Sequence, residues 1–192
     1  MGLFRKKRDF SKEVEAFHQG VKGLKVSPTL EENVALMKEL FENVDIMRYR
    51  FVEAGGCKDI AVIFSDGLVN AAVINDNILR PLMRGEPLPE GKDRMKRLTG
   101  EVVQISESEL TSEFDRLLPA ISYGDTILFA EGSDEAAILN TKSFPTRSII
   151  EPDSEKTLYG PREGFTESIM QNISMVRRRA RTPALKIRHL TV

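Results

Sequence analysis

The spacing of apolar residues switches between a helical period and a strand period several times along this chain. Between Leu30 and Val44 apolar residues recur every three or four positions, the pattern of an amphipathic helix. From Met47 to Phe51 they alternate with arginines, as in a strand with one solvated face. The run Ile60–Phe64 is continuously apolar, which is typical of a central strand buried on both faces. Helices interspersed with strands predict an α/β fold.

Four further segments carry patterns of the same kind. They are the helical stretches 68–83 and 110–121 and the short strands 127–130 and 136–139, which flank a hairpin turn. Pro81 is expected to disturb the last turn of the first helix, because proline has no N–H to donate. Ser106 and Glu109 have the spacing of a capping box in front of the second helix. Weaker patterns predict strands at 101–105 and 146–150, and a helical turn near Met95 in the loop 84–100.

The predicted fold class is α/β, with a mixed β-sheet covered by helices. Residues 27–157 form the predicted α/β subdomain. Residues 1–26 show no sustained period, so we expect a basic, flexible N-terminal segment there. Residues 158–192 are expected to hold a linker, an arginine-rich helix and the first strand of an incomplete second subdomain. Because the alternation near the C-terminus stops after half a strand, we expect this sequence to be a fragment of a longer protein.

The net charge of −1 is the sum of an acidic body and two basic ends. Residues 1–26 carry +4, residues 177–192 carry +6 and the residues between them carry −11. Nucleic-acid binders place positive charge on their folded face, so we expect no nucleic-acid partner. The basic ends favour an anionic membrane surface or an acidic partner. The uncharged stretch 67–75 is far shorter than the roughly 20 residues that span a bilayer.

Catalytic and metal-binding patterns do not occur in the sequence. Cys57 is the single cysteine, and His18 and His189 lie near the two ends of the chain, so no Cys–His pair or zinc-ligand spacing arises. The acidic residues fall on the solvated faces of the predicted helices. We therefore expect no enzyme, no catalytic residue, no metal and no cofactor.

Two segments near the C-terminus hold the candidate functional residues. The first consists of Gly160, Pro161, Arg162, Glu163 and Phe165. Proline and glutamate suit the first turn of a helix, which favours a structural start signal. The alternative is an anion site on the same backbone amides, with Arg162 as its clamp.

The second segment is an arginine run at the end of a predicted helix. It consists of Arg177, Arg178, Arg179 and Arg181. These cations stabilise the negative end of the helix dipole, and that role alone is one interpretation. The other is a contact surface for anionic lipid headgroups or a partner protein.

The stretch from Tyr159 to Leu185, which contains GPREGFTESIMQNISMVRRRARTPAL, resembles a segment of the GerA family of spore germination proteins. Further landmarks occur in the same order. They are Ser27–Leu30 with the helix that follows, Asp45–Arg48, Ser65–Val69 and Ile149–Pro152. The resemblance therefore runs from about residue 27 to the C-terminus.

This resemblance implies the N-terminal region of the A subunit of a nutrient germinant receptor, without enzymatic activity. In the family this region lies on the cytoplasmic side of the inner spore membrane and precedes transmembrane helices. The implied role is sensing, signalling and subunit assembly, with B- and C-type subunits, the inner spore membrane and a small-molecule nutrient as partners. The resemblance also implies that Gly160, Pro161, Arg162, Glu163 and Phe165 form a junction between subdomains. The arginine run is then a contact surface.

A second hypothesis remains open from the residues alone. The glycine-flanked turn at 160–164 and the mixed sheet also favour a small-ligand or nucleotide-binding α/β domain, because ligands commonly bind at strand ends.

Overall fold

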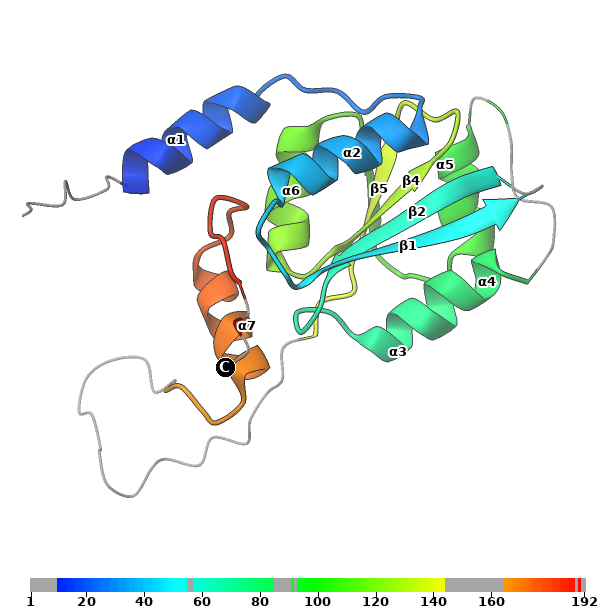
Figure 1. Cartoon of the computed structure of the whole chain (residues 1–192). Coiled ribbons are helices and arrows are strands. Elements are labelled where there is room, and N and C mark those ends of the chain that lie inside the picture. Colours follow the sequence, from blue (N-terminus) through cyan, green and yellow to red (C-terminus); the bar gives the residue numbers. More distant parts are fainter. Residues whose placement is uncertain are drawn as a thin grey trace, which may run out of the picture.

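Figure 1 shows the computed structural model of the chain, which describes residues 10–54, 57–84, 91, 93–143, 164–188 and 190. The helices are α1 (Phe10–Val21), α2 (Leu30–Leu40), α3 (Ala71–Val73), α4 (Arg80–Leu82), α5 (Arg94–Arg97), α6 (Phe114–Tyr123) and α7 (Ile169–Arg179). Two π-helical segments are η1 (Ile74–Leu79) and η2 (Leu98–Val102). The strands are β1 (Met47–Ala54), β2 (Cys57–Ser65), β3 (Ser108–Thr111), β4 (Thr126–Ala130) and β5 (Ala136–Leu139).

The five strands form one sheet in the order β1-β2-β4-β5-β3. All four pairings in it are antiparallel, so the sheet is not the mixed one that the sequence predicts. In β2, Ile60, Ala61, Val62 and Ile63 are fully buried, so the prediction of a central strand is confirmed. The α/β class with a helix-covered sheet is confirmed as well, and β4 and β5 form the predicted hairpin.

Helices cover both faces of the sheet, as Figure 1 shows. On one face α2 and α6 pack over Ile63, Phe129 and the alternate residues of β2 and β4. On the other face η1, α4, α5 and η2 pack over Ile60 and Val62. Because successive side chains of a strand point to opposite faces, the buried strands supply both cores.

Pro81 lies at the end of a continuous helical run formed by α3, η1 and α4. A proline cannot donate to the carbonyl four residues earlier, which belongs to Asn77. That carbonyl instead accepts from the N–H of Gln104 at 2.9 Å, and the Asn77 side chain donates to the Gln104 carbonyl at 2.8 Å. The helix therefore tolerates its proline, because a loop from elsewhere in the chain satisfies the carbonyl.

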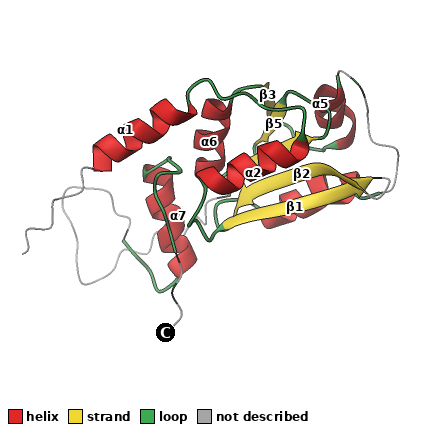
Figure 2. Cartoon of the chain, turned by 45° about the horizontal axis from the view of Figure 1, so that its top comes forward, coloured by secondary structure: helices red, strands yellow, loops and turns green. Residues whose placement is uncertain are grey.

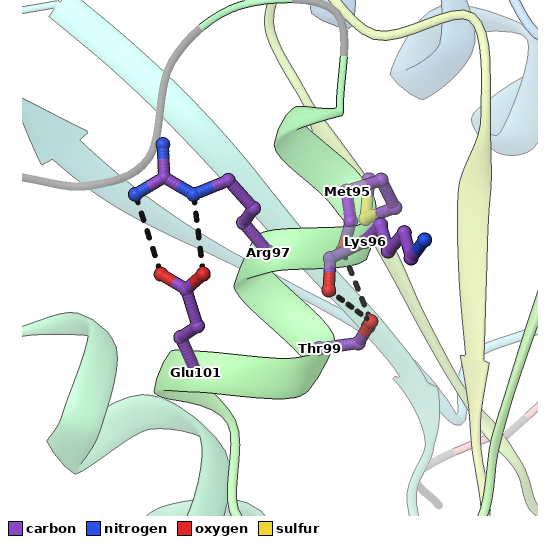
Figure 3. A network of polar contacts seen from close by, with 5 residues as sticks. All are labelled: Met95, Lys96, Arg97, Thr99 and Glu101. Atoms are coloured by element: carbon purple, nitrogen blue, oxygen red, sulfur yellow. Dashed lines mark hydrogen bonds and ion pairs between the residues drawn. The ribbon is translucent and has the colours of Figure 1, made fainter.

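The segment from α5 through η2 shows why the predicted strand at 101–105 is wrong. Arg97 and Glu101 make two contacts of 3.3 Å, and the Thr99 hydroxyl donates to the carbonyls of Met95 and Lys96 (Figure 3). Met95 and Leu98 face the core from this helical turn. Local i,i+4 contacts and burial of one face therefore hold the segment helical, and the predicted turn near Met95 is confirmed.

Two other predictions of local structure were wrong. Residues 108–111 form the edge strand β3 rather than a helix start, so Ser106 and Glu109 make no capping box, and α6 begins at Phe114. Before residue 27 the structure has the helix α1, although no regular element is expected there. Phe17 and Val21 of α1 pack against the main core, which provides the apolar face that stabilises this helix. The predicted strand at 146–150 lies outside the described residues.

Candidate functional site: the arginine-rich helix α7

Helix α7 begins with a closed network of hydrogen bonds. The N–H of Thr166 donates to Asn172 Oδ1 at 2.7 Å, and Asn172 Nδ2 donates back to the Thr166 carbonyl at 2.6 Å. The Thr166 hydroxyl accepts from the N–H of Ser168 at 3.2 Å, and Ser168 is the N-cap residue whose hydroxyl accepts from Gln171. These bonds satisfy amides that a helix start leaves unpaired.

The same network begins helix α2. The N–H of Ser27 donates to Asn33 Oδ1 at 2.8 Å, Asn33 Nδ2 donates to the Ser27 carbonyl at 2.6 Å, and the Ser27 hydroxyl accepts from the N–H of Thr29. Thr29 is the N-cap residue, but its own side chain makes no capping bond. Glu32 accepts from the Ser27 hydroxyl, as Gln171 accepts from the Thr166 hydroxyl. One helix-start motif is therefore used twice.

One face of α7 packs beside α6 and the turn after β2. Ile173 is buried in the main core and Met170 packs against it. Gly67 has a φ of +77°, and a Cβ there would lie 2.7 Å from Met170 Cε. A glycine at this turn therefore permits the left-handed backbone, and the flexible end of the Met170 side chain packs over it.

Arg177 is the buried anchor of α7. Its side chain is 1% exposed, Nη1 donates to the Thr182 carbonyl at 3.1 Å and Nη2 donates to the Leu185 carbonyl at 2.7 Å. Burial lowers the pKa of Arg177 to about 10, so the guanidinium stays charged at neutral pH. Arg177 therefore organises the turn that follows the helix, and it does not lie on the surface expected of a contact residue.

The other three arginines of the run are more exposed than Arg177. Arg178 is half-buried, and Arg179 and Arg181 are exposed. The Arg181 guanidinium lies 3.6 Å from the centroid of the Tyr123 ring at the end of α6, and Arg181 Nε donates to the Arg178 carbonyl. The arginine run therefore mixes a fully buried side chain with solvent-facing cations.

The chain after α7 returns along the end of α2 and the segment that precedes β1. The Ile187 carbonyl accepts from the N–H of Asp45 at 3.1 Å, and Ile187 forms an isolated parallel bridge with Val44. Lys186 Nζ donates to the Leu40 carbonyl at 2.9 Å, and burial lowers the pKa of Lys186. Residues 185–188 thus form a single β-bridge, whereas the sequence predicts the first half of a strand there.

Large apolar side chains are exposed at the start of α7. Phe165 is 75% exposed and Ile169 is 61% exposed. Leu190 is exposed as well, and Figures 1 and 2 show α7 beside α6 at one end of the molecule. Among the described residues Met83, at the end of α4, is the one other exposed large hydrophobic side chain. Phe165 and Ile169, four residues apart, thus place two exposed apolar side chains at the start of α7.

The remaining predicted site residues, Gly160, Pro161, Arg162 and Glu163, lie outside the described residues. Neither the junction role nor the anion site therefore gains or loses support there. In the described part of the chain, no cluster of His, Cys, Asp or Glu side chains has the arrangement of a metal site. None of the described helices has the length and apolar character to span a bilayer.

The sequence contained two signals for this site that its interpretation missed. Arg177 follows Ile173 by four positions, so it continues the buried stripe of the helix rather than the exposed one. The pattern shared by residues 27–33 and 166–172, with a hydroxyl residue first and third and asparagine seventh, marks the repeated helix start.

Comparisons with known proteins match most of the chain. The profile of the Bacillus/Clostridium GerA spore germination protein family matches residues 35–192. Spore germination protein KA of Bacillus subtilis is 32% identical over 163 residues, covering 83% of this chain and 30% of that protein. Spore germination protein B1 of the same organism is 28% identical over 170 residues, covering 88% and 35%. The chain spans about a third of the length of these relatives.

A solved structure has the same fold. It is the crystal structure of the N-terminal domain of the A subunit of the Bacillus megaterium spore germinant receptor GerK3, with a TM-score of 0.62 and 22% sequence identity. The match covers 83% of this chain and 57% of that one. The family match extends over the second half of α2, the whole described sheet and α7, and the chain therefore belongs to the Bacillus/Clostridium GerA spore germination protein family.

Proposed function

We propose that this chain is the N-terminal region of the A subunit of a nutrient germinant receptor and acts in spore germination as a sensing, signalling and assembly module. Family membership and the likeness to the GerK3 domain support this role. The module lies on the cytoplasmic side of the inner spore membrane, next to B- and C-type subunits. It carries out no catalysis, and the nutrient acts as a ligand rather than a substrate.

Helix α7 is the connecting element of this module. One observation carries this proposal: the helix joins a buried anchor, Arg177, to exposed apolar residues, Phe165 and Ile169. Exposed apolar side chains that gather at one place are a common mark of an interaction surface. The buried guanidinium holds the turn that follows the helix, and Ile173 packs in the core beside the sheet, so α7 is held in place behind its exposed residues.

The domain organisation follows from the same helix. Residues 27–157 form the first subdomain, and residues 158–192 begin a second one. The repeated helix start supports this division, because α7 starts as α2 starts. Ile169 occupies in α7 the position that Leu30 has in α2, but the Ile169 side chain is exposed. We place the rest of the receptor, either later chain of the same subunit or its partner subunits, over Phe165 and Ile169, with Arg179 and Arg181 at the rim.

A matched pair of substitutions in the full-length protein tests this role. Ile169→Asp places a charge on the proposed surface, and Met83→Asp places the same charge on an equally exposed apolar residue of a different face. We expect I169D spores to germinate poorly and to retain less B- and C-type subunit in co-purification, while M83D spores match the unsubstituted strain. Normal germination and co-purification by I169D spores would contradict the proposal.

A further inference from the structure

A groove of about 500 Å³ lies between the start of α2 and the face of strand β1. Its walls come from α2 and from Phe51 of β1, and Glu131 in the turn after β4 closes one end. A volume in this range suits a small organic ligand. The groove contains no residue of α7, so its function is independent of the assembly role proposed above.

The floor of the groove is apolar and rigid. Leu30 and Val34 are buried core residues of α2, and Phe51 is half-buried against the same core. Ala35, also on α2, lines the groove with an exposed methyl group. A small side chain at this position keeps the groove open above a floor that the core holds in place.

The two ends of the groove carry opposite charges. Glu31 and Glu131 lie at the first turn of α2, where Glu131 Oε2 accepts from the N–H of Leu30 at 2.8 Å. Lys38 lies seven residues after Glu31, which is about 10 Å along a helix that rises 1.5 Å per residue. Its Nζ lies 5.8 Å from the centroid of the Tyr49 ring. The groove therefore offers carboxylates at one end and an ammonium at the other.

We propose that this groove binds a short zwitterionic peptide with an apolar side chain. The peptide's ammonium group pairs with Glu31 and Glu131, its carboxylate pairs with Lys38, and its side chain packs on Val34 and Phe51. An extended chain advances about 3.3–3.6 Å per residue, so a tripeptide spans about 10 Å. A single α-amino acid carries both charges on one carbon and cannot reach both ends.

Titration of the 192-residue chain with Ala-Leu-Ala tests the charge pattern. Binding is followed by calorimetry with the free peptide, its N-acetyl form and its C-terminal amide. We expect saturable binding of the free peptide, and a weakening of about two- to fivefold for each charge removed, the range of exposed ion pairs. Equal affinities for the three forms, or no saturable binding of the free peptide, would overturn the proposal.

Three variants test the place of binding. Ala35→Trp fills the groove, whereas Glu39→Trp puts the same side chain on an exposed position of the same helix outside the groove. The chain has no tryptophan, so each variant carries a single fluorophore that also reports folding. We expect A35W to lose peptide binding and E39W to keep it.

Lys38→Gln should abolish the difference between the free peptide and its amide. Undiminished binding by A35W, or an undiminished preference of K38Q for the free carboxylate, would overturn the assignment.

Discussion

Helices α2 and α7 begin with the same hydrogen-bond network but bury different faces. The residue after the N-cap is Leu30 in α2, which is 2% exposed, and Ile169 in α7, which is 61% exposed. The network therefore determines where each helix begins, while the surrounding chain determines which face is covered. Because of this difference, α7 has an exposed apolar surface at its start and α2 does not.

The largest expected difference between the two helices lies at the position after the N-cap. Leu30→Ala removes a core side chain and should lower the free energy of unfolding by about 2–5 kcal/mol. Ile169→Ala truncates an exposed side chain and should change it by less than about 0.5 kcal/mol. Urea denaturation of both variants measures these values. Equal losses would show that Ile169 is covered in the free chain, which would break the comparison.

Arg177 and Arg179 provide the same contrast within α7. Arg177→Ala leaves the carbonyls of Thr182 and Leu185 without their donor and should lower the free energy of unfolding by about 1–3 kcal/mol. Arg179→Ala, at an exposed position, should change it by less than about 0.5 kcal/mol. Thermal and urea unfolding of the two variants check this. A neutral R177A would refute the anchor role.

Gly67 tests the attachment of α7 to the turn after β2. Gly67→Ala forces an L-residue into the left-handed region, at a cost of about 1–2 kcal/mol, and places its Cβ against Met170. We expect faster amide hydrogen exchange in α7, and partial recovery in the double variant G67A/M170A. Unchanged exchange in α7 would show that this contact does not hold the helix.

The smallest expected effects concern the shared network itself. Asn33→Ala and Asn172→Ala each remove the two bonds between the asparagine and the residue that starts the motif. Each should lower the free energy of unfolding by about 0.5–1.5 kcal/mol. Similar losses in urea denaturation would support two equivalent helix starts, whereas a neutral N172A would mean that only the first contributes to stability.

Strong periodic patterns were sufficient to predict most of the fold. The alternation in β1, the apolar run in β2 and the stripe of α2 each mark a face that the core buries, and their predictions are confirmed. The edge strand β3 carries exposed residues, Ser108 and Glu109, so it has no apolar alternation to detect. Helix α1 was missed because its apolar face is short and depends on contacts with a distant core.

The candidate site was less predictable than the fold. A run of arginines does not by itself reveal which one is buried, because that depends on how α7 packs on α6. The exposure of Phe165 and Ile169 likewise depends on tertiary contacts. The groove over Val34 and Phe51 joins residues from α2, β1 and a turn, which no spacing within one segment predicts.

Site-specific photo-crosslinking in spores tests the contact role of α7 most directly. A photoreactive phenylalanine analogue replaces Ile169 in the full-length protein, and the same analogue at Met83 serves as the control for exposed apolar positions. Our account predicts that residue 169 crosslinks to another receptor subunit or to later chain of its own subunit, and that residue 83 does not. Crosslinking at residue 169 no stronger than at residue 83 would contradict it.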